Sequence, residues 1–262
     1  MIVIDGVSKR FGDKQAVDGV SLCLEPGTIT GFIGPNGAGK TTTLKMLTGI
    51  LTPDEGKIVL NGHDMGQEPE EAKMEFGYIS DNPDLFIHLK GMEYIKFICD
   101  VYQVSEADRK ERLDALLQEF EMADAVNDKI ETYSHGMRQK IHIIACLMHD
   151  PKLWIMDEPM TGLDPQSSYL LKQRMKAHAK AGNMVLFSTH VLEVAEKLCD
   201  QIAIINKGKI TYTGTLEALR SRYPEKSLEE IFLIITGSMV IKESADQLEA
   251  DREGGEDHAS LS

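Results

Sequence analysis

The chain has 262 residues, of which 42% are hydrophobic, and a formal net charge of −14 at pH 7. This length and apolar content suffice for one large domain, or for a domain with a small subdomain. The tail from Lys242 to Ser262 holds seven acidic and two basic residues, so it contributes −5 and the rest of the chain −9. Such an acidic chain argues against non-specific binding of nucleic acid, although a local basic patch is not excluded.

The four cysteines, at positions 23, 99, 146 and 199, are widely spaced and each lies among apolar residues. We therefore expect reduced thiols in the core and a cytosolic compartment. No apolar run approaches the roughly 18–20 residues of a membrane span, and the N-terminus lacks the pattern of a secretion signal. If the protein serves a membrane, we expect another subunit to supply the spans.

The first segments of the chain have the pattern of β-strands. Residues 2–11 are expected to form a strand near the edge of a sheet, and residues 17–24 a second strand after a turn. Phe11, at the end of the first strand, has two interpretations of equal weight. Its ring either stacks on an adenine base or is a half-buried strand residue.

Residues 34–41 read GPNGAGKT and match the phosphate-loop pattern G-x-x-x-x-G-K-[ST]. An apolar strand at 29–33 precedes them and a helical pattern at 42–47 follows, which makes a chance match improbable. Glycines let backbone N–H groups turn toward phosphates, and the new helix adds its positive end. We expect Lys40 to reach the β- and γ-phosphates and the Thr41 hydroxyl to ligate Mg²⁺. The predicted nucleotide-binding residues here are Gly34, Pro35, Asn36, Gly37, Ala38, Gly39, Lys40, Thr41 and Thr42.

Between about residues 84 and 150 the pattern becomes helical, which predicts a helical insertion between two α/β parts. One helix is expected at 92–102. Ser105 with Asp108 resembles an N-terminal cap of the next helix. Apolar side chains follow at helical spacing and are most simply core: Leu113, Leu116, Leu117 and Phe120.

Two polar groups lie further along the chain. Ser134 and Gly136, in YSHGMRQK at 133–140, stand where a helix is about to begin, which is either an ordinary cap or an anion site. The apolar strand at 153–157 ends in two acids, Asp157 and Glu158. Beside a phosphate loop, we expect Asp157 to hold Mg²⁺ and Glu158 to polarise the attacking water. The alternative, a solvated strand end, is weakened by the phosphate loop in the same chain.

The remaining segments continue the α/β alternation. A turn at 161–165 leads into a helix to about residue 180, and a buried strand at 184–187 runs into Ser-Thr-His at 188–190. His190 lies at the carboxyl end of that strand, where it can contact the γ-phosphate and Glu158. A helix at 191–199, a hairpin at 202–212 and a capping box at 227–230 before a short helix follow. We expect the acidic segment from about 242 to be disordered.

In their order and spacing, these motifs resemble those of the ATP-binding subunit of ABC transporters over roughly residues 1–237, most closely the bacterial ABC-2 exporter group. The resemblance implies an α/β fold, with a P-loop NTPase core, an antiparallel β subdomain and a helical subdomain at about 84–150. Residues 238–262 then form an acidic, disordered tail. The family's signature segment aligns with residues 133–137, where His135 replaces a usual Gly and Met137 a usual Gln.

The resemblance also implies a mechanism with ATP and Mg²⁺. Lys40, Thr41, Asp157, Glu158 and His190 would act on ATP held by their own chain. Ser134 and Gly136 would close over the γ-phosphate held by a second ATP-binding subunit, and Asp164 would bridge the two sites. The family's Gln that touches Mg²⁺ aligns with Asp81, which either ligates the metal or only couples motion.

The partners implied are a second ATP-binding subunit and a membrane-spanning permease, with the chain peripheral on the cytoplasmic face of the cell membrane. By resemblance, the permease contacts the region from Asp81 to Leu89, in which Phe86 is apolar. No nucleic-acid partner is expected. One alternative is a non-transport ATPase of the same family acting on ribosomes or DNA. A regulatory module without turnover is disfavoured because Glu158 and His190 are both present.

Overall fold

The computed structural model describes residues 1–237, so the acidic tail predicted at 238–262 lies outside the described residues. Two compact units are present, Met1–Leu216 and a second that begins at Glu217. Helix α8 (Leu216–Arg222) begins at their boundary, and α9 (Leu228–Ile235) lies in the second unit. The predicted capping box opens α9: the N–H of Glu230 donates to Ser227 Oγ over 3.2 Å, and the N–H of Ser227 donates to the Glu230 carboxylate over 2.7 Å.

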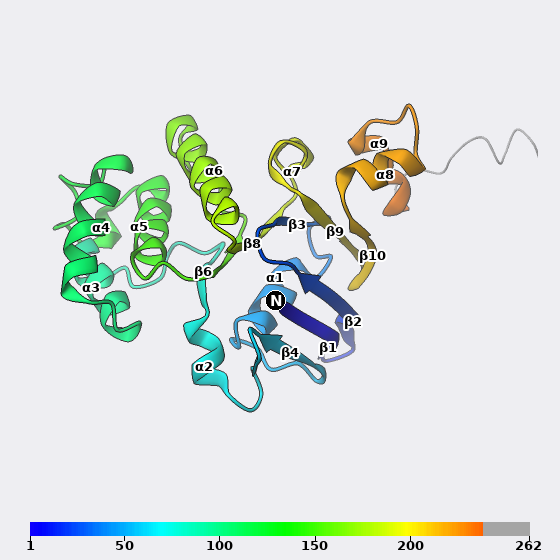
Figure 1. The fold of residues 1–262 in the computed structure, drawn as a ribbon, viewed down its shortest axis with the longest axis horizontal. Helices are drawn as coiled ribbons and strands as arrows, with labels where there is room; N and C mark the ends of the chain where they lie inside the picture. Colours follow the sequence, from blue (N-terminus) through cyan, green and yellow to red (C-terminus); the bar gives the residue numbers. More distant parts are fainter. Residues whose placement is uncertain (238–262) are drawn as a thin grey trace, which may run out of the picture. The chain divides into compact units, whose positions relative to one another are not determined.

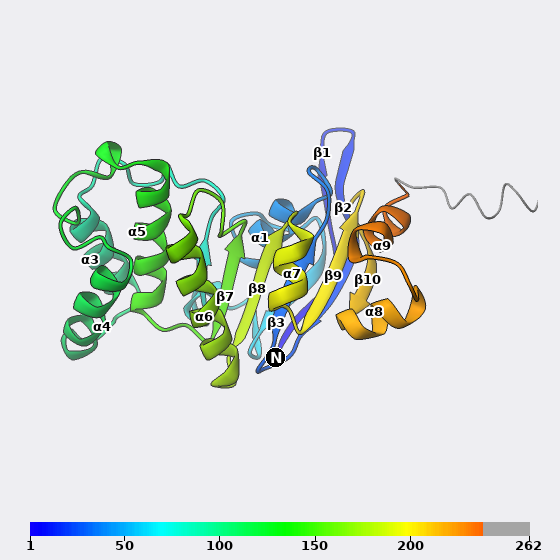
Figure 2. The ribbon, with the colours of Figure 1, turned by 90° about the horizontal axis from the view of Figure 1, so that it is seen from above.

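The first unit contains a six-stranded sheet in the order β10-β9-β3-β8-β7-β6, in which β9 to β6 run parallel and β10 is antiparallel to β9. Helices α6 (Pro165–Lys180) and α7 (Leu192–Leu198) lie on one face and α1 (Lys40–Leu47) on the other (Figures 1 and 2). Cover on both faces explains the continuous burial of the central strands. The strands are β3 Ile29–Ile33, β6 Phe76–Ile79, β7 Leu153–Asp157, β8 Met184–Thr189, β9 Gln201–Asn206 and β10 Lys209–Gly214.

An antiparallel sheet of four strands packs beside it, in the order β2-β1-β4-β5. Its strands are β1 Ile2–Phe11, β2 Lys14–Leu24, β4 Glu55–Leu60 and β5 His63–Asp64. The first strand lies near an edge of its sheet, as predicted: β1 is next to the edge strand β2, although it pairs with β2 on one side and with β4 on the other. A strand's own residue pattern reports which face is buried and not how many neighbours it pairs with.

The predicted helical insertion is present between β6 and β7 and forms a group beside the six-stranded sheet (Figure 1). Ser105 caps the second of its helices, accepting from the N–H of Asp108 over 3.2 Å as predicted. Among residues 1–237, no helix combines the length and the apolar character needed to cross a membrane. The helical segments from residue 69 to 148 are α2 Pro69–Met74, α3 Gly91–Val101, α4 Glu106–Glu119, the 3₁₀ turn η1 Ile130–Thr132 and α5 His135–Met148.

The first unit has two apolar cores, one under α3 to α7 and one between the two sheets around α1. Leu116, Leu117 and Phe120 of the predicted stripe are buried in the first core, and Leu113 packs against it. These buried positions confirm the helical spacing as a core signal.

All four cysteines are free thiols, but only two are fully buried. Burial raises the pKa of Cys146 to about 12, so this thiol is unreactive at neutral pH. The prediction of a core position was wrong for Cys23, which is exposed. Its strand neighbours Leu22 and Leu24 face the core, and strand alternation therefore turns Cys23 outward.

Candidate active site

The phosphate loop joins the end of β3 to the start of α1 and is held tightly against neighbouring strands. A Cβ added to Gly39 would lie 2.7 Å from the carbonyl of Ala16, and one added to Gly34 would clash with the carbonyl of Ile205. Gly39 also has φ of 113°, which a side chain would strain. The first turn of α1 carries no acidic side chain. The loop and the helix N-terminus therefore form an anion-binding cradle that requires glycine.

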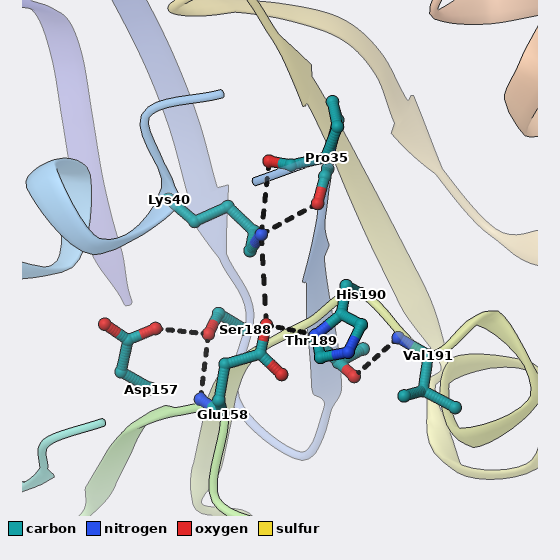
Figure 3. A network of polar contacts seen from close by, with 9 residues as sticks. Pro35, Lys40, Asp157, Glu158, Ser188, Thr189, His190 and Val191 are labelled. Atoms are coloured by element: carbon teal, nitrogen blue, oxygen red, sulfur yellow. Dashed lines mark hydrogen bonds and ion pairs between the residues drawn. The ribbon is translucent and has the colours of Figure 1, made fainter. Parts of the chain in front are cut away.

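Lys40 lies folded over this loop (Figure 3). Its amine donates to the carbonyl of Gly34 over 2.7 Å and lies 3.8 Å from Glu158 Oε1. Burial lowers the pKa of Lys40, and the charges of Glu158 and Asp157 act in the opposite direction. The amine is thus a buried cation held between the loop and a carboxylate.

A cavity of about 320 Å³ adjoins the loop. Phe11 is half exposed at its wall, so the structure brings this aromatic ring to the phosphate loop, a position the sequence left open. Base stacking by Phe11 stays a prediction. The cavity is lined by Phe11, Lys14, Ala16, Asn36, Gly37, Gly39, Lys40, Thr41, Thr42, Asp81 and Glu158.

Asp157 is completely buried at the end of β7. Ser188, on the adjacent parallel strand β8, donates from its hydroxyl to Asp157 Oδ1 over 2.5 Å. Burial raises the pKa of Asp157, and the hydrogen bond from Ser188 opposes that rise. Its second oxygen, Oδ2, has no hydrogen-bond partner among the described residues. A buried, unsatisfied carboxylate oxygen is costly unless a cation or a water satisfies it, so this group fits a metal ligand.

The other predicted metal ligands, Thr41 and Asp81, both line the cavity. Asp81 is exposed, and its Oδ1 accepts from Ser80 Oγ over 3.2 Å. Within residues 1–237 no group of three or more His, Cys, Asp or Glu side chains is arranged to hold a metal. Mg²⁺ normally uses one or two carboxylates together with substrate phosphates, so the donors present fit it. Their role stays a prediction.

Glu158 is held by contacts with three residues, Ser188, His190 and Lys40 (Figure 3). Its N–H donates to Ser188 Oγ over 2.9 Å, and its Oε1 lies 2.9 Å from His190 Nδ1 and 3.8 Å from the Lys40 amine. Its backbone is left-handed, with φ of 49°, which costs a non-glycine residue about 1 kcal/mol or more. The structure therefore brings together Lys40, Glu158 and His190, the three residues predicted to be catalytic.

Ser188 was given no role in the sequence analysis. It fixes both acids at once, because its hydroxyl donates to Asp157 and accepts from the backbone of Glu158. The available signal was a hydroxyl at the end of a buried strand next to the strand that ends in two acids. Which strands are neighbours is decided by the fold, and the sequence alone does not report it.

Ser134, Gly136 and Asp164 are absent from the lining of the phosphate-loop cavity. Ser134 caps α5, accepting from the N–H of Met137 over 3.3 Å. A Cβ on Gly136 would lie 2.6 Å from the carbonyl of Gly162, so the signature packs against the turn that leads into α6. These residues form a second cluster, separate from the loop of their own chain.

Asp164 connects the two helices of this second cluster, α5 and α6. Its Oδ1 accepts from the N–H of Ser167 over 2.8 Å and caps α6, and its Oδ2 lies 2.8 Å from the Lys140 amine of α5. The Lys140 side chain, with Ser167, holds the pKa of Asp164 well below its usual range. Asp164 is therefore ionised at neutral pH and links the first turns of α5 and α6.

Comparisons with known proteins agree with this geometry. The family model described as "ABC transporter" matches residues 17–161. The chain is 38% identical to the ABC-type transporter ATP-binding protein EcsA of Bacillus subtilis, over 90% of this chain and 96% of that protein. It is 37% identical to the Nod factor export ATP-binding protein I of Cupriavidus metallidurans, over 78% and 67%. A solved ATP-binding subunit of an ABC transporter superposes with a TM-score of 0.86 at 32% identity and covers 90% and 99% of the two chains.

Proposed function

Because this chain belongs to the ABC transporter family as an ATP-binding subunit, we propose that its phosphate-loop cavity is one half of an ATP site shared by two such subunits. The chain is an ATPase whose hydrolysis of ATP serves transport. The observation that carries the proposal is the separation of the two clusters. Ser134 and Gly136, at the start of α5, are absent from the lining of their own chain's cavity, and a helix start of this kind is suited to an anion.

The hydrolytic step follows from the groups around Glu158. Its carboxylate takes a proton from water as the water oxygen bonds to the γ-phosphorus and the bond to the leaving ADP oxygen breaks. His190 donates from Nδ1 to the carboxylate and orients it, since the two atoms are 2.9 Å apart. The Lys40 amine, which donates to a carbonyl of the loop in this structure, would contact the phosphate oxygens instead and neutralise the charge of the phosphates. Mg²⁺, held by Thr41 and Asp157 with Asp81 nearby, would supply further charge neutralisation at the phosphates.

The second half of the site is supplied across the subunit pair. The Ser134 hydroxyl and the first N–H groups of α5 would contact the γ-phosphate held by the opposite chain. Asp164, paired with Lys140, would fix the signature at the junction of the two sites. A pair in which each chain's phosphate loop faces the other chain's signature closes with two-fold symmetry when the chains are identical.

The membrane partner is a separate spanning subunit, with this chain peripheral on the cytoplasmic face. The residues that support a docking surface for it are Phe86 and Phe97, whose rings lie 5.7 Å apart and are each nearly half exposed. Exposed neighbouring aromatics are typical of interaction sites. Export is the favoured direction because the matched relative from Cupriavidus metallidurans is an export protein. Ribosome or DNA action is disfavoured by the acidic chain.

A complementation assay tests the shared site. One chain carries Lys40→Ala, which removes its own phosphate contact, and the other carries Ser134→Arg, which blocks its signature. Each variant alone is expected to be inactive. Mixed in equal amounts, they should recover up to roughly a quarter of the wild-type ATPase rate, because half of the pairs are mixed and each has one intact site. A mixture no more active than its separate components would contradict the shared site.

A further inference from the structure

A second cavity, here called the sheet-junction cavity, lies where the antiparallel sheet meets the six-stranded sheet. Its volume is about 430 Å³, and its walls come from β1 and β2 of the antiparallel sheet and from β3, β9 and β10 of the other. The edge strands of the two sheets, β2 and β10, lie side by side (Figures 1 and 2). Sites for small organic molecules commonly have volumes in this range, so the cavity is large enough to hold one.

The sheet-junction cavity and the phosphate loop lie at opposite ends of β3. Thr30, in the cavity wall, is the second residue of that strand, whereas the phosphate loop begins directly after its last residue, Ile33. Gln201, also in the wall, is the first residue of the parallel strand β9. Within residues 1–237 the two cavities share no lining residue. Because nucleotides bind at the carboxyl ends of such strands, an occupant of the sheet-junction cavity is a molecule other than ATP.

Thr30 brings a buried hydroxyl to this cavity. The residue is 2% exposed, and its Oγ1 has no hydrogen-bond partner within the described part of the chain. Side chains alternate along a strand, so Thr30 lies on the same face of β3 as Phe32, which belongs to the core between the two sheets. The Thr30 side chain therefore points toward the antiparallel sheet, the side on which the cavity lies. A buried hydroxyl without a partner is costly, so this group favours an occupant that forms a hydrogen bond with it.

The rest of the wall selects against charged ligands. Ile4, Leu22 and Ile202 contribute buried apolar side chains. Among the described residues, Asp5 is the one charged side chain in the wall, and Lys, Arg and His are absent from it. An anion would lose its hydration in this cavity without gaining a cation, and Asp5 would repel it. The lining therefore suits an uncharged, largely apolar molecule.

We propose that the sheet-junction cavity binds a small uncharged molecule with an apolar body and a single hydroxyl group, and that this hydroxyl forms a hydrogen bond with Thr30. The apolar body packs against Ile4, Leu22 and Ile202. The inference is independent of the shared ATP site, because none of these four residues belongs to the phosphate loop or to the signature.

Cys23 gives the cavity its own chemical reporter. This residue is exposed and lines the cavity on β2. Cys99 and Cys146 are buried, and burial raises the pKa of Cys199, so these three thiols are expected to react slowly with an uncharged alkylating reagent. The rate at which iodoacetamide alkylates Cys23 therefore measures access to the cavity, and Cys23→Ser identifies the reaction by removing it.

Cyclohexanol is the probe, added to the full chain. Its dissociation constant, measured by NMR of isoleucine methyl groups with Ile4 and Ile202 as the wall positions, is expected in the millimolar range of ligands with so few heavy atoms. Half-saturation should slow alkylation of Cys23 about twofold, because only the unoccupied protein reacts. Cyclohexanecarboxylate has a similar shape but is anionic, so it should neither shift these resonances nor slow the alkylation. A titration with cyclohexanol that leaves both readouts unchanged would overturn the proposal, as would equal effects of the carboxylate.

Thr30→Val tests the hydrogen bond, because valine keeps the branched shape and removes the hydroxyl. The dissociation constant of cyclohexanol should rise about fivefold, which corresponds to the loss of one net hydrogen bond. The free energy of unfolding, measured by denaturant titration, should stay level or increase, because a hydroxyl without a partner is removed. The matched control is Thr48→Val, since Thr48 is buried and its hydroxyl donates to the carbonyl of Leu44 over 3.0 Å. This control should lower the free energy of unfolding and leave cyclohexanol binding unchanged.

Two results from these variants would contradict the proposed hydrogen bond and overturn the proposal. An unchanged affinity for cyclohexanol in Thr30→Val would show that the probe fills the cavity without using the hydroxyl. A loss of stability in Thr30→Val as large as that in Thr48→Val would show that the Thr30 hydroxyl already has a partner, such as an ordered water.

Discussion

Replacing Glu158 by Gln isolates the role of its negative charge. The carboxylate oxygen lies 2.9 Å from His190 Nδ1 and 3.8 Å from the Lys40 amine, and glutamine keeps the size of the side chain. An amide cannot accept a proton from water at neutral pH. A positioned general base contributes about 10²- to 10⁴-fold, so we expect kcat to fall by at least about a hundredfold.

The same change should leave ATP binding intact or tighten it. Glu158 competes with phosphate for Lys40, and at 3.8 Å this attraction is on the order of a few kcal/mol before solvent and neighbouring charges weaken it. Loss of that competition, and of repulsion with the γ-phosphate, predicts an ATP dissociation constant equal to or several-fold below that of the wild type.

Two assays check these expectations, phosphate release at saturating MgATP and titration with a fluorescent ATP analogue. Glu111→Gln is the control, because Glu111 is an exposed acid on α4, away from the cavity. Turnover within about threefold of the wild type would refute the assignment of Glu158 as the base. Loss of ATP binding would instead show that its charge supports the loop.

Three further predictions follow from specific contacts. Ser188→Ala should lower kcat about tenfold and destabilise the fold by about 1–2 kcal/mol, because it removes the hydrogen bonds of Ser188 to Asp157 and to the backbone of Glu158. ATPase and denaturation assays measure both effects, and the control is Ser221→Ala, which loses one exposed hydrogen bond to a backbone carbonyl. Phe86→Asp should abolish co-purification of a membrane subunit, whereas Tyr169→Asp, at an aromatic residue more exposed than Phe86, should not; retained co-purification of the Phe86→Asp variant would exclude Phe86 from the interface. Burial lowers the pKa of His149 and of His178 to about 4, so the stability each contributes is complete above pH 6.5 and is lost as pH falls toward 4. The free energy of unfolding, measured by denaturant titration, should be about 2 kcal/mol lower at pH 5 than at pH 7 for each histidine, and His178→Leu should remove the part of this difference that comes from His178. Equal free energies of unfolding at the two pH values would contradict buried, neutral rings.

Local interactions explain which structural features could be predicted from the sequence. The caps at Ser105, Ser134 and Ser227 each join residues three apart, so the pattern that predicts them also contains the partner. The phosphate loop is equally local, since its glycines, Lys40 and the following helix lie in one segment. Family resemblance then gave the roles of the separate motifs.

Non-local pairing explains the features that the sequence did not predict. The interior position of β1 and the exposed thiol of Cys23 depend on strand neighbours and on which face packs. Ser188 acquires its role because β8 lies beside β7. None of these facts is contained in the residues of one segment.

The sequence by itself therefore determined the anion cradle at Gly34–Thr41, the acids at the end of the strand before residue 159 and the start of the signature helix. Only the tertiary structure decided that Lys40 lies 3.8 Å from Glu158, that Phe11 reaches the cavity and that Arg138 forms an ion pair with Asp84. The physical reason is chain separation: a cap or a glycine turn is stabilised by its neighbours in sequence. The functional contacts instead join side chains 31 to 118 positions apart, and packing of the whole sheet and helix group brings them together.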